Sequence, residues 1–224
     1  MNVLKTENLK KYYGSGDSLV KALDGVDFSV EQGEFVAVVG TSGSGKSTFL
    51  NMMGGLDNPT SGSVKIDGKE IAGMSHDELT VFRRRQIGFI FQNYNLVPML
   101  NVYENIVLPI ELDGNKPDKK FIDDIVKMLH LENKLDCFPN NLSGGQQQRA
   151  AIARAIAFKP AIILADEPTG NLDSKTGQEV LGLLKQTAES YRQTLVMITH
   201  NLEIAQLADR IVRIEDGRIV ERGV

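Results

Sequence analysis

The sequence has 224 residues, of which 42% are hydrophobic and 24% are charged, and its formal net charge is −4. This composition is typical of globular proteins and excludes a mostly disordered chain, and the length fits one large domain or two small ones. The acidic balance does not favour nucleic acid as a partner, since proteins that bind a duplex usually carry a basic surplus.

Short apolar runs alternate with helical patterns along the chain. GEFVAVVG (33–40) is followed by a helix that begins near Lys46, and IGFIF (87–91), AIILADE (161–167) and TLVMITH (194–200) are further strands of the buried type. Buried strands interleaved with helices form parallel sheets that are covered on both faces. The sequence therefore predicts an α/β fold.

Two regions depart from this alternation. Asp67-Gly68 and Asp216-Gly217 are typical of the turns of antiparallel hairpins. Between Gln92 and Pro160 the strand signal stops, and DKKFIDDIVKMLHL (118–131) places its apolar residues on one helical face. We expect a single domain over 1–224, with an α/β core formed by 1–91 and 160–224 and a helical insert over 92–159.

The loop after the first buried strand has the pattern of a phosphate-binding loop. GTSGSGKS, Gly40 to Ser47, matches G-x-x-x-x-G-K-[ST] at every fixed position, between a strand and a helix. Glycines let successive backbone N–H groups turn towards an anion, and the helix N-terminus adds its positive end. Lys46 would reach the β- and γ-phosphates, and the Ser47 hydroxyl would ligate Mg²⁺. A flexible Gly/Ser turn would not require this lysine and serine.

Polar residues follow the other strands where sites of open α/β sheets lie. Asp166 and Glu167 end IILADE, so Asp166 can hold the Mg²⁺ shell and Glu167 can polarise an attacking water as general base. His200 ends TLVMITH, and we expect a γ-phosphate contact from it, although lone histidines at strand ends are more often structural. Gln92 follows IGFIF and can present an amide oxygen to the metal or to water, although a glutamine after a strand means little by itself.

A second glycine motif, LSGGQ (142–146), lies a hundred residues further on. Ser143 and Gln146 have the spacing of a capping box, so Ser143 can simply cap its own helix. Two glycines, Gly144 and Gly145, would also let an anion approach bare N–H groups. A symmetric head-to-tail dimer would place Lys46 of one copy and Ser143 of the other against one nucleotide.

Five motifs follow one another along the chain: GTSGSGKST, FQNYNL, LSGGQQQR, IILADEPTGNLD and ITH. In this order they resemble the nucleotide-binding subunits of ATP-binding-cassette (ABC) transporters, and the resemblance covers essentially the whole chain. Within that family it is similar to the branch of macrolide and peptide exporters, lipoprotein-releasing systems and the cell-division ATPase. The resemblance implies a P-loop NTPase core with a RecA-like parallel sheet, an N-terminal antiparallel β part and an inserted helical subdomain.

The resemblance also implies a role for each matching residue. Glu167 would be the base, His200 the γ-phosphate sensor, and Ser143, Gly145 and Gln146 the contacts made in trans, with Asp173 linking the two sites. Tyr13 matches the aromatic residue that stacks on adenine, although its neighbour Tyr12 leaves that assignment open by one position. The metal set would be Ser47, Gln92 and Asp166. The phosphate loop would comprise Gly40, Thr41, Ser42, Gly43, Ser44, Gly45, Lys46, Ser47 and Thr48.

The implied function is an ATP-hydrolysing motor, with ATP and Mg²⁺ bound, that works as a homodimer on the cytoplasmic face of the cell membrane. A membrane permease would dock near residues 92–109, and we expect some of Tyr94, Leu96, Pro98 and Met99 to be exposed there, although for most side chains of that segment a place in the core of the insert is the better interpretation. The alternative is a soluble cassette acting on nucleic acid or the ribosome, which usually needs a duplicated cassette, a long coiled coil or a basic surface. A P-loop kinase or GTPase would leave LSGGQ unexplained. No residue distinguishes the cargo.

Overall fold

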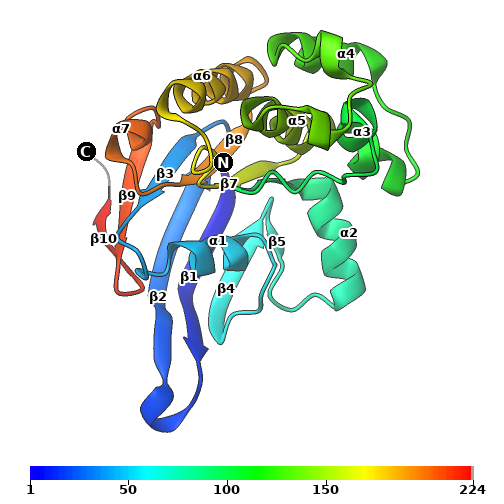
Figure 1. Ribbon diagram of the computed structural model, residues 1–224. Coiled ribbons are helices and arrows are strands. Elements are labelled where there is room, and N and C mark those ends of the chain that lie inside the picture. The colour runs from blue at the N-terminus through cyan, green and yellow to red at the C-terminus, as the bar shows by residue number, and fades with distance from the viewer. Residues whose placement is uncertain (223–224) are drawn as a thin grey trace. The chain divides into compact units, whose positions relative to one another are not determined.

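The computed structural model (Figure 1) describes residues 1–222. The chain divides into two compact units. Unit 1 combines residues 1–83 with the residues from 194 onward, and unit 2 comprises residues 84–193. The expected bounds of the helical insert, 92–159, stay a prediction.

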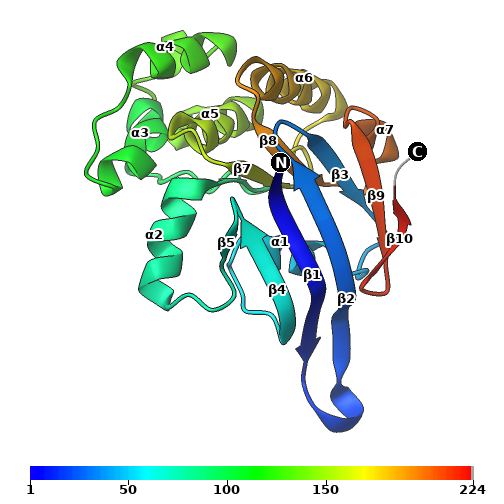
Figure 2. The ribbon, with the colours of Figure 1, turned by 180° about the vertical axis from the view of Figure 1, so that it is seen from behind.

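Unit 1 contains a four-stranded antiparallel sheet with the strand order β2-β1-β4-β5. Its strands are β1 (Asn2–Tyr13), β2 (Val20–Glu31), β4 (Ser61–Ile66) and β5 (Lys69–Glu70), and a 3-10 turn, Gly16–Ser18, joins the first two. Seen from behind, β2, β1 and β4 lie side by side (Figure 2). Asp67 and Gly68 both have positive φ, 48° and 74°, which confirms the predicted hairpin turn between β4 and β5.

The other strands of unit 1 are mostly parallel. β3 (Phe35–Val39) pairs in parallel with β8 (Thr194–Ile198) and with β9 (Arg210–Glu215), and β10 (Arg218–Arg222) pairs antiparallel with β9. Every residue of β3 and β8 is buried, as expected of strands covered on both faces. The helices are α1 (Lys46–Met53), α7 (Leu202–Ala205) and the first turns of α2 (His76–Gln86).

Unit 2 combines two parallel strands with four helices. β6 (Ile87–Ile90) pairs with β7 (Ile162–Asp166), and α5 (Gly144–Ala157) packs against α3 (Val102–Leu112), α4 (Lys119–Met128) and α6 (Ser174–Ser190). The pair α5 and α6 lies side by side in Figure 1. Two 3-10 turns, Glu132–Lys134 and Pro139–Asn141, precede α5. Along residues 1–222, no helix has both the length and the apolar character that spanning a membrane requires.

The predicted helix at 118–131 is confirmed as α4, with one difference in its apolar face. Ile122, Ile125, Val126 and Leu129 are buried. Phe121 is only half-buried, and its ring packs against Tyr191 in an edge-to-face arrangement with the two centroids 4.9 Å apart. Helix α4 therefore uses one aromatic contact at its margin and aliphatic contacts at its centre.

The strand registers place the predicted polar residues at sheet edges. Val38 is paired with Ile198 in the neighbouring strands β3 and β8. Gly40 and His200 come two residues later in each case, so both follow their strands at the same edge of the sheet in unit 1. Ile90 is paired with Ala165 in β6 and β7, so Gln92 and Glu167 likewise follow the ends of two paired strands in unit 2. Parallel pairing thus brings site candidates together within each unit, as the strand pattern predicted.

Candidate functional site

The phosphate-loop segment of unit 1 needs its glycines for steric reasons. A Cβ on Gly45, which has φ +103°, would lie 2.3 Å from the carbonyl oxygen of Ala22. A Cβ on Gly40 would lie 2.3 Å from the carbonyl oxygen of Ile214 and 2.7 Å from Ser44 Oγ. Because real Cβ atoms do not approach backbone oxygens so closely, only glycine permits this path of the loop.

The same segment offers hydrogen-bond donors to an anion. Helix α1 begins at Lys46 directly after Gly45, and no side chain caps its N-terminus. The Lys46 ammonium is buried and donates to the carbonyl oxygens of Gly40 (2.9 Å) and Thr41 (2.8 Å), so it lies across the loop. Ser44 Oγ is buried without a hydrogen-bond partner among the described residues. An uncapped helix start, a lysine and an unpaired hydroxyl fit the polyphosphate of a nucleotide.

The two candidate tyrosines at the end of β1 point to different partners. The Tyr12 hydroxyl donates to Asp24 Oδ1, and Asp24 also accepts from Arg218 at 2.7 Å. The Tyr13 hydroxyl donates to Asp57 Oδ2 at 3.0 Å. Tyr13 is 41% exposed. Of the two rings, Tyr13 is the one bonded to Asp57, in the segment that follows α1.

In unit 2, Gln92 is tied to the loop that follows β7. Its Nε2 donates to Asn171 Oδ1 at 3.1 Å, while Asn171 Nδ2 donates to the Gln92 carbonyl oxygen at 3.1 Å and to Asn93 Oδ1 at 2.8 Å. A Cβ on Gly170 would lie 2.6 Å from Gln92 Nε2, so the two segments touch. The donor Nε2 is thereby occupied, which orients the Gln92 amide.

The two acidic candidates lie at the end of β7. Asp166 is the last residue of the strand and is half-buried. Glu167 follows it with φ +42°, a conformation that non-glycine residues rarely adopt, and its carbonyl oxygen accepts from Gly170 N–H at 2.9 Å. Such strain is concentrated at functional sites. Asp173 caps helix α6 by accepting from Thr176 N–H at 3.1 Å, and hydrogen bonding by the side chain of Thr176, followed by its backbone, lowers the pKa of the Asp173 carboxyl.

The LSGGQ segment confirms the predicted capping box. Ser143 Oγ accepts from Gln146 N–H at 3.3 Å, and Gln146 Oε1 accepts from Ser143 N–H at 2.9 Å. The structure also supplies a reason for both glycines that the sequence did not show. A Cβ on Gly144 would lie 2.8 Å from the Tyr94 hydroxyl, and a Cβ on Gly145 would lie 2.5 Å from Thr176 Cγ2. Packing inside unit 2 therefore requires two glycines, whether or not an anion approaches them.

The segment from 92 to 101 is held by two residues that sequence reasoning missed. Asn105 is fully buried; its Oδ1 accepts from Val97 N–H at 2.8 Å, and its Nδ2 donates to three carbonyl oxygens of residues 97–101. Arg154 donates to the carbonyl oxygens of Tyr94 (3.0 Å) and Asn95 (2.6 Å). An asparagine in the apolar helix VYENIVLP is the one sequence signal of this arrangement. Pro98 and Met99 are exposed, as expected, and Met99 is 85% exposed.

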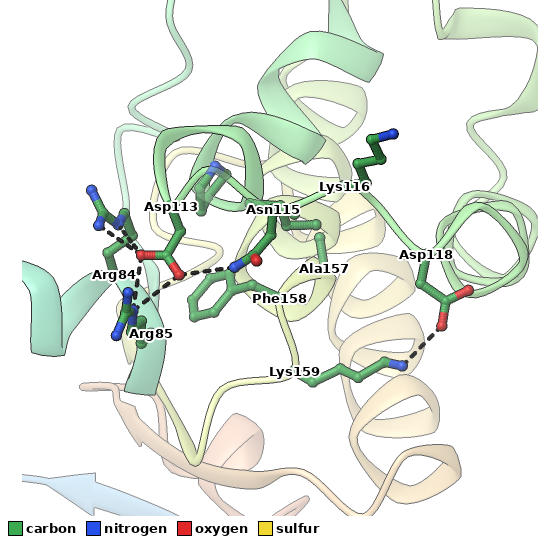
Figure 3. Close-up of a pocket in the computed structure, with 11 residues that line it drawn as sticks. Arg84, Arg85, Asp113, Asn115, Lys116, Asp118, Ala157, Phe158 and Lys159 are labelled. Atoms are coloured by element: carbon green, nitrogen blue, oxygen red, sulfur yellow. Dashed lines mark hydrogen bonds and ion pairs between the residues drawn. The ribbon is translucent and has the colours of Figure 1, made fainter.

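A pocket of about 310 Å³ lies at the far end of α3 (Figure 3). Arg84 and Arg85 both bind Asp113 there, with closest distances of 2.6 Å and 2.9 Å. Hydrogen bonds from Arg85 and then from Arg84 lower the pKa of Asp113. Lys159 pairs with Asp118 at 3.1 Å on the other side of the pocket. The pocket wall is thus fixed by ion pairs and has more cations than anions.

Comparison with known proteins identifies the family. The ABC transporter family matches residues 23–170. The ABC transporter ATP-binding protein MJ0796 of Methanocaldococcus jannaschii is 45% identical over 224 residues, which cover 97% of this chain and 95% of that protein. The macrolide export ATP-binding/permease protein MacB of Mannheimia succiniciproducens is 45% identical over 223 residues, which cover 99% of this chain and 34% of MacB.

A solved structure agrees with this assignment. A dimeric structure of MJ0796 in a post-hydrolysis state, bound to ADP and Pi, has a TM-score of 0.87 and 44% identity, and the match covers 98% of this chain and 97% of that one. The mixed α/β fold predicted from the sequence is therefore that of an ATP-binding cassette. The chain belongs to the ABC transporter family.

Proposed function

We propose that this chain is the ATP-hydrolysing subunit of an ABC transporter-type membrane complex, and that two copies close around ATP and reopen after hydrolysis. The phosphate loop carries the proposal, because an uncapped helix start and a buried Lys46 that lies across the loop are features that a plain turn does not require. In this proposal residues 40–48 hold the phosphates and Tyr13 stacks on the adenine.

The proposed metal is Mg²⁺, held by Ser47, Gln92 and Asp166. A hydroxyl, an amide oxygen and a carboxylate are the oxygen ligands that Mg²⁺ prefers. The hydrogen bond from Gln92 Nε2 to Asn171 supports the assignment, because it leaves the amide oxygen as the free end of the side chain. When bound, Mg²⁺ would neutralise charge on the phosphate oxygens.

Hydrolysis then requires a base and a contact to the γ-phosphate. We assign the base to Glu167, whose strained backbone sets the direction of its side chain, and the γ-phosphate contact to His200 at the sheet edge that it shares with Gly40. Lys46 would stabilise charge on the transferred phosphoryl group.

The dimer follows from the position of LSGGQ. In this proposal Ser143, Gly144, Gly145 and Gln146 of one copy contact the nucleotide held by the other copy, and Asp173 lies at the contact between copies. Two findings support it: Ser143 is exposed at the start of a helix, and MJ0796 has been solved as a dimeric cassette with ADP and Pi.

The proposed partner is an integral membrane permease that docks near residues 92–109. Pro98 and Met99 are exposed in a segment held rigid by Asn105, and the pocket in Figure 3 adjoins Pro109. The name of MacB joins an ATP-binding part with a permease part. The chain would then act at the cytoplasmic face of the membrane, with no nucleic acid partner.

Mixed dimers test the proposal. Chains with Lys46→Ala and chains with Ser143→Arg are each expected to lose ATPase activity. A mixed dimer would have one site with both lesions and one site with neither, so activity should return when the two variants are mixed. Loss of the helix cap at Ser143 would by itself cost about 1 kcal/mol of stability. Ser143→Asn controls for that loss, because asparagine can also cap the helix. A mixture no more active than either variant alone would contradict assembly in trans.

A further inference from the structure

Two charged residues outside the phosphate-loop motif hold the ring of Tyr13. Lys11 lies two residues earlier in β1, and Asp57 lies in the segment after α1. Lys11 Nζ donates to Asp57 Oδ1 at 2.8 Å, and the Tyr13 hydroxyl donates to Asp57 Oδ2 at 3.0 Å. Both carboxylate oxygens of Asp57 are therefore engaged, one by each side chain. We call Lys11, Asp57 and Tyr13 the tyrosine clamp.

The Lys11 ammonium also covers one face of the ring. Its Nζ lies 4.9 Å from the centroid of the Tyr13 ring, and it donates further to the carbonyl oxygen of Asn58 at 2.7 Å. The side chain of Lys11 is only 13% exposed. A carboxylate, a carbonyl oxygen and an aromatic face together use the three N–H groups of the ammonium. Lysine therefore occupies one face of the ring in a fixed way.

Proton positions in the clamp are stable near neutral pH. Desolvation acts to raise the pKa of Asp57, but hydrogen bonds from Lys11, Tyr13 and Asn58 N–H outweigh it, and the net pKa is lowered. Desolvation and the hydrogen bond to Asp57 raise the pKa of Tyr13. The carboxylate thus stays charged and the phenol stays a donor at the pH of the cell.

The clamp is attached to both the sheet and the phosphate loop. Thr60 N–H donates to the Lys10 carbonyl oxygen at 2.8 Å, and Tyr12 N–H donates to Thr60 Oγ1 at 2.9 Å, which fixes the Asp57 segment along β1. Helix α1 begins with Lys46 and leads into this same segment, since Leu56 N–H donates to the Asn51 carbonyl oxygen at 2.8 Å. One helix therefore links the loop at its start to the clamp at its end.

We propose that Lys11 and Asp57 are positioning residues for the nucleobase, which orient Tyr13 so that adenine stacks on the ring face opposite the Lys11 ammonium. This inference rests on the proposed function, because it requires Tyr13 to stack on the base. The benefit is pre-organisation: a ring already held in place does not lose its rotational freedom when the nucleotide binds.

Binding of ATP and of inorganic tripolyphosphate to the full chain tests the proposal, since the second ligand has phosphates but no base. Lys11→Met and Tyr13→Phe should each weaken ATP binding about two- to tenfold, the range expected for freeing one side chain, and leave tripolyphosphate binding unchanged. Tyr13→Ala should weaken ATP binding at least as much. In a Tyr13→Ala chain, adding Lys11→Met should have no further effect on ATP, because no ring remains to be positioned.

The neighbouring tyrosine supplies matched controls. Lys21 Nζ lies 5.5 Å from the centroid of the Tyr12 ring, so Lys21→Met removes a similar contact from the wrong ring. Lys21→Met and Tyr12→Phe should leave both ligands unaffected. Calorimetric titration gives the affinities. Thermal unfolding should show that Tyr13→Phe, which removes one hydroxyl, leaves the chain folded.

The outcomes separate this inference from the proposed function. If Tyr13→Ala weakens ATP binding but Lys11→Met and Tyr13→Phe do not, the clamp is refuted and the stacking role stands. If Lys11→Met weakens tripolyphosphate as much as ATP, Lys11 acts on the phosphates and the clamp is again refuted. If Tyr13→Ala binds ATP normally, the stacking role and the clamp both fail, and a chain that binds neither ligand would overturn the proposed function itself.

Discussion

The geometry of the phosphate loop is most sharply tested by two alanine substitutions at glycines of similar backbone conformation. Gly43 has φ +79° and Gly45 has φ +103°. A Cβ on Gly43 meets no atom within 4 Å, whereas a Cβ on Gly45 would lie 2.3 Å from the Ala22 carbonyl oxygen and 3.3 Å from Leu23 Cδ2. Gly43→Ala therefore isolates the backbone strain, and Gly45→Ala adds a collision with the main chain of β2.

The expected losses in the free energy of unfolding follow from these contacts. A left-handed backbone costs a non-glycine residue about 1–2 kcal/mol, which is the whole effect expected for Gly43→Ala. The collision at Gly45 adds about 1–3 kcal/mol, in the range seen when a packed core is overfilled. At this chain length that difference corresponds to a melting temperature lower by roughly 2–12 °C for Gly45→Ala than for Gly43→Ala.

Urea unfolding followed by circular dichroism measures both variants beside the unmodified chain. The dependence of the unfolding free energy on urea should be unchanged, so that the shift in midpoint reports stability alone. Gly45→Ala should also bind ATP more weakly, because Gly45 sets the start of α1. If Gly45→Ala unfolds at the same urea concentration as Gly43→Ala, the path of the loop described above is wrong.

Three further predictions concern side chains outside that loop. Asn105→Ala should destabilise the chain by about 2–4 kcal/mol, because buried backbone groups lose their partners, whereas the exposed Asn115→Ala should change little in the same thermal scan. Hydrogen bonds from Arg218 and Tyr12 lower the pKa of Asp24 to about 2, so the Asp24 carboxylate stabilises the fold above pH 4 and loses this contribution as the pH falls towards 2. The stabilities of the original chain and Asp24→Asn, measured in acid titrations, should therefore converge at low pH. Asn171→Ala should raise the Mg²⁺ concentration needed for half-maximal ATPase activity, because Asn171 orients the Gln92 amide. It should have no added effect in a Gln92→Ala chain, and independent effects of the two substitutions that multiply in the double variant would refute the coupling of Asn171 to Gln92.

Local signals in the sequence predicted the parts of the fold that depend on neighbouring residues. The five residues of β3 are apolar in sequence and buried in the structure, and the glycine-lysine pattern after them marks the start of α1. Asp216 and Gly217, both with positive φ, form the second predicted hairpin turn. In these places, composition and backbone conformation act over a few residues, so the sequence suffices.

The N-terminal strands were harder to predict because their pattern is irregular. The pairing of β1 with β2 shifts register at four places, one of them between Thr6 and Leu9, where Asn8 has φ 45°. Each shift changes which residues face the core, so the alternation expected of a strand is lost. The strand bounds were therefore not visible in the sequence, although the family resemblance implied an antiparallel part.

Parts of the candidate site could not be predicted because they depend on contacts between distant residues. Lys11 reaches Asp57 across 46 positions, and Gln92 reaches Asn171 across 79. The two glycines of LSGGQ suggested an anion, but Tyr94 and Thr176 already require them for packing. The sequence indicates that these two positions need glycine, but it does not show whether a bound anion or packing against neighbouring side chains is the reason.

The central claim is that each nucleotide lies between two copies of the chain. Sedimentation of Glu167→Gln with ATP and Mg²⁺ tests it most directly, because slowing hydrolysis by about 10²–10⁴-fold, as expected when a general base is lost, preserves the ATP-bound state. We expect a dimer with ATP, a monomer without it, and a monomer again when Ser143→Arg is added. If Glu167→Gln binds ATP and stays monomeric at high protein concentration, the nucleotide does not join two copies and the account is contradicted.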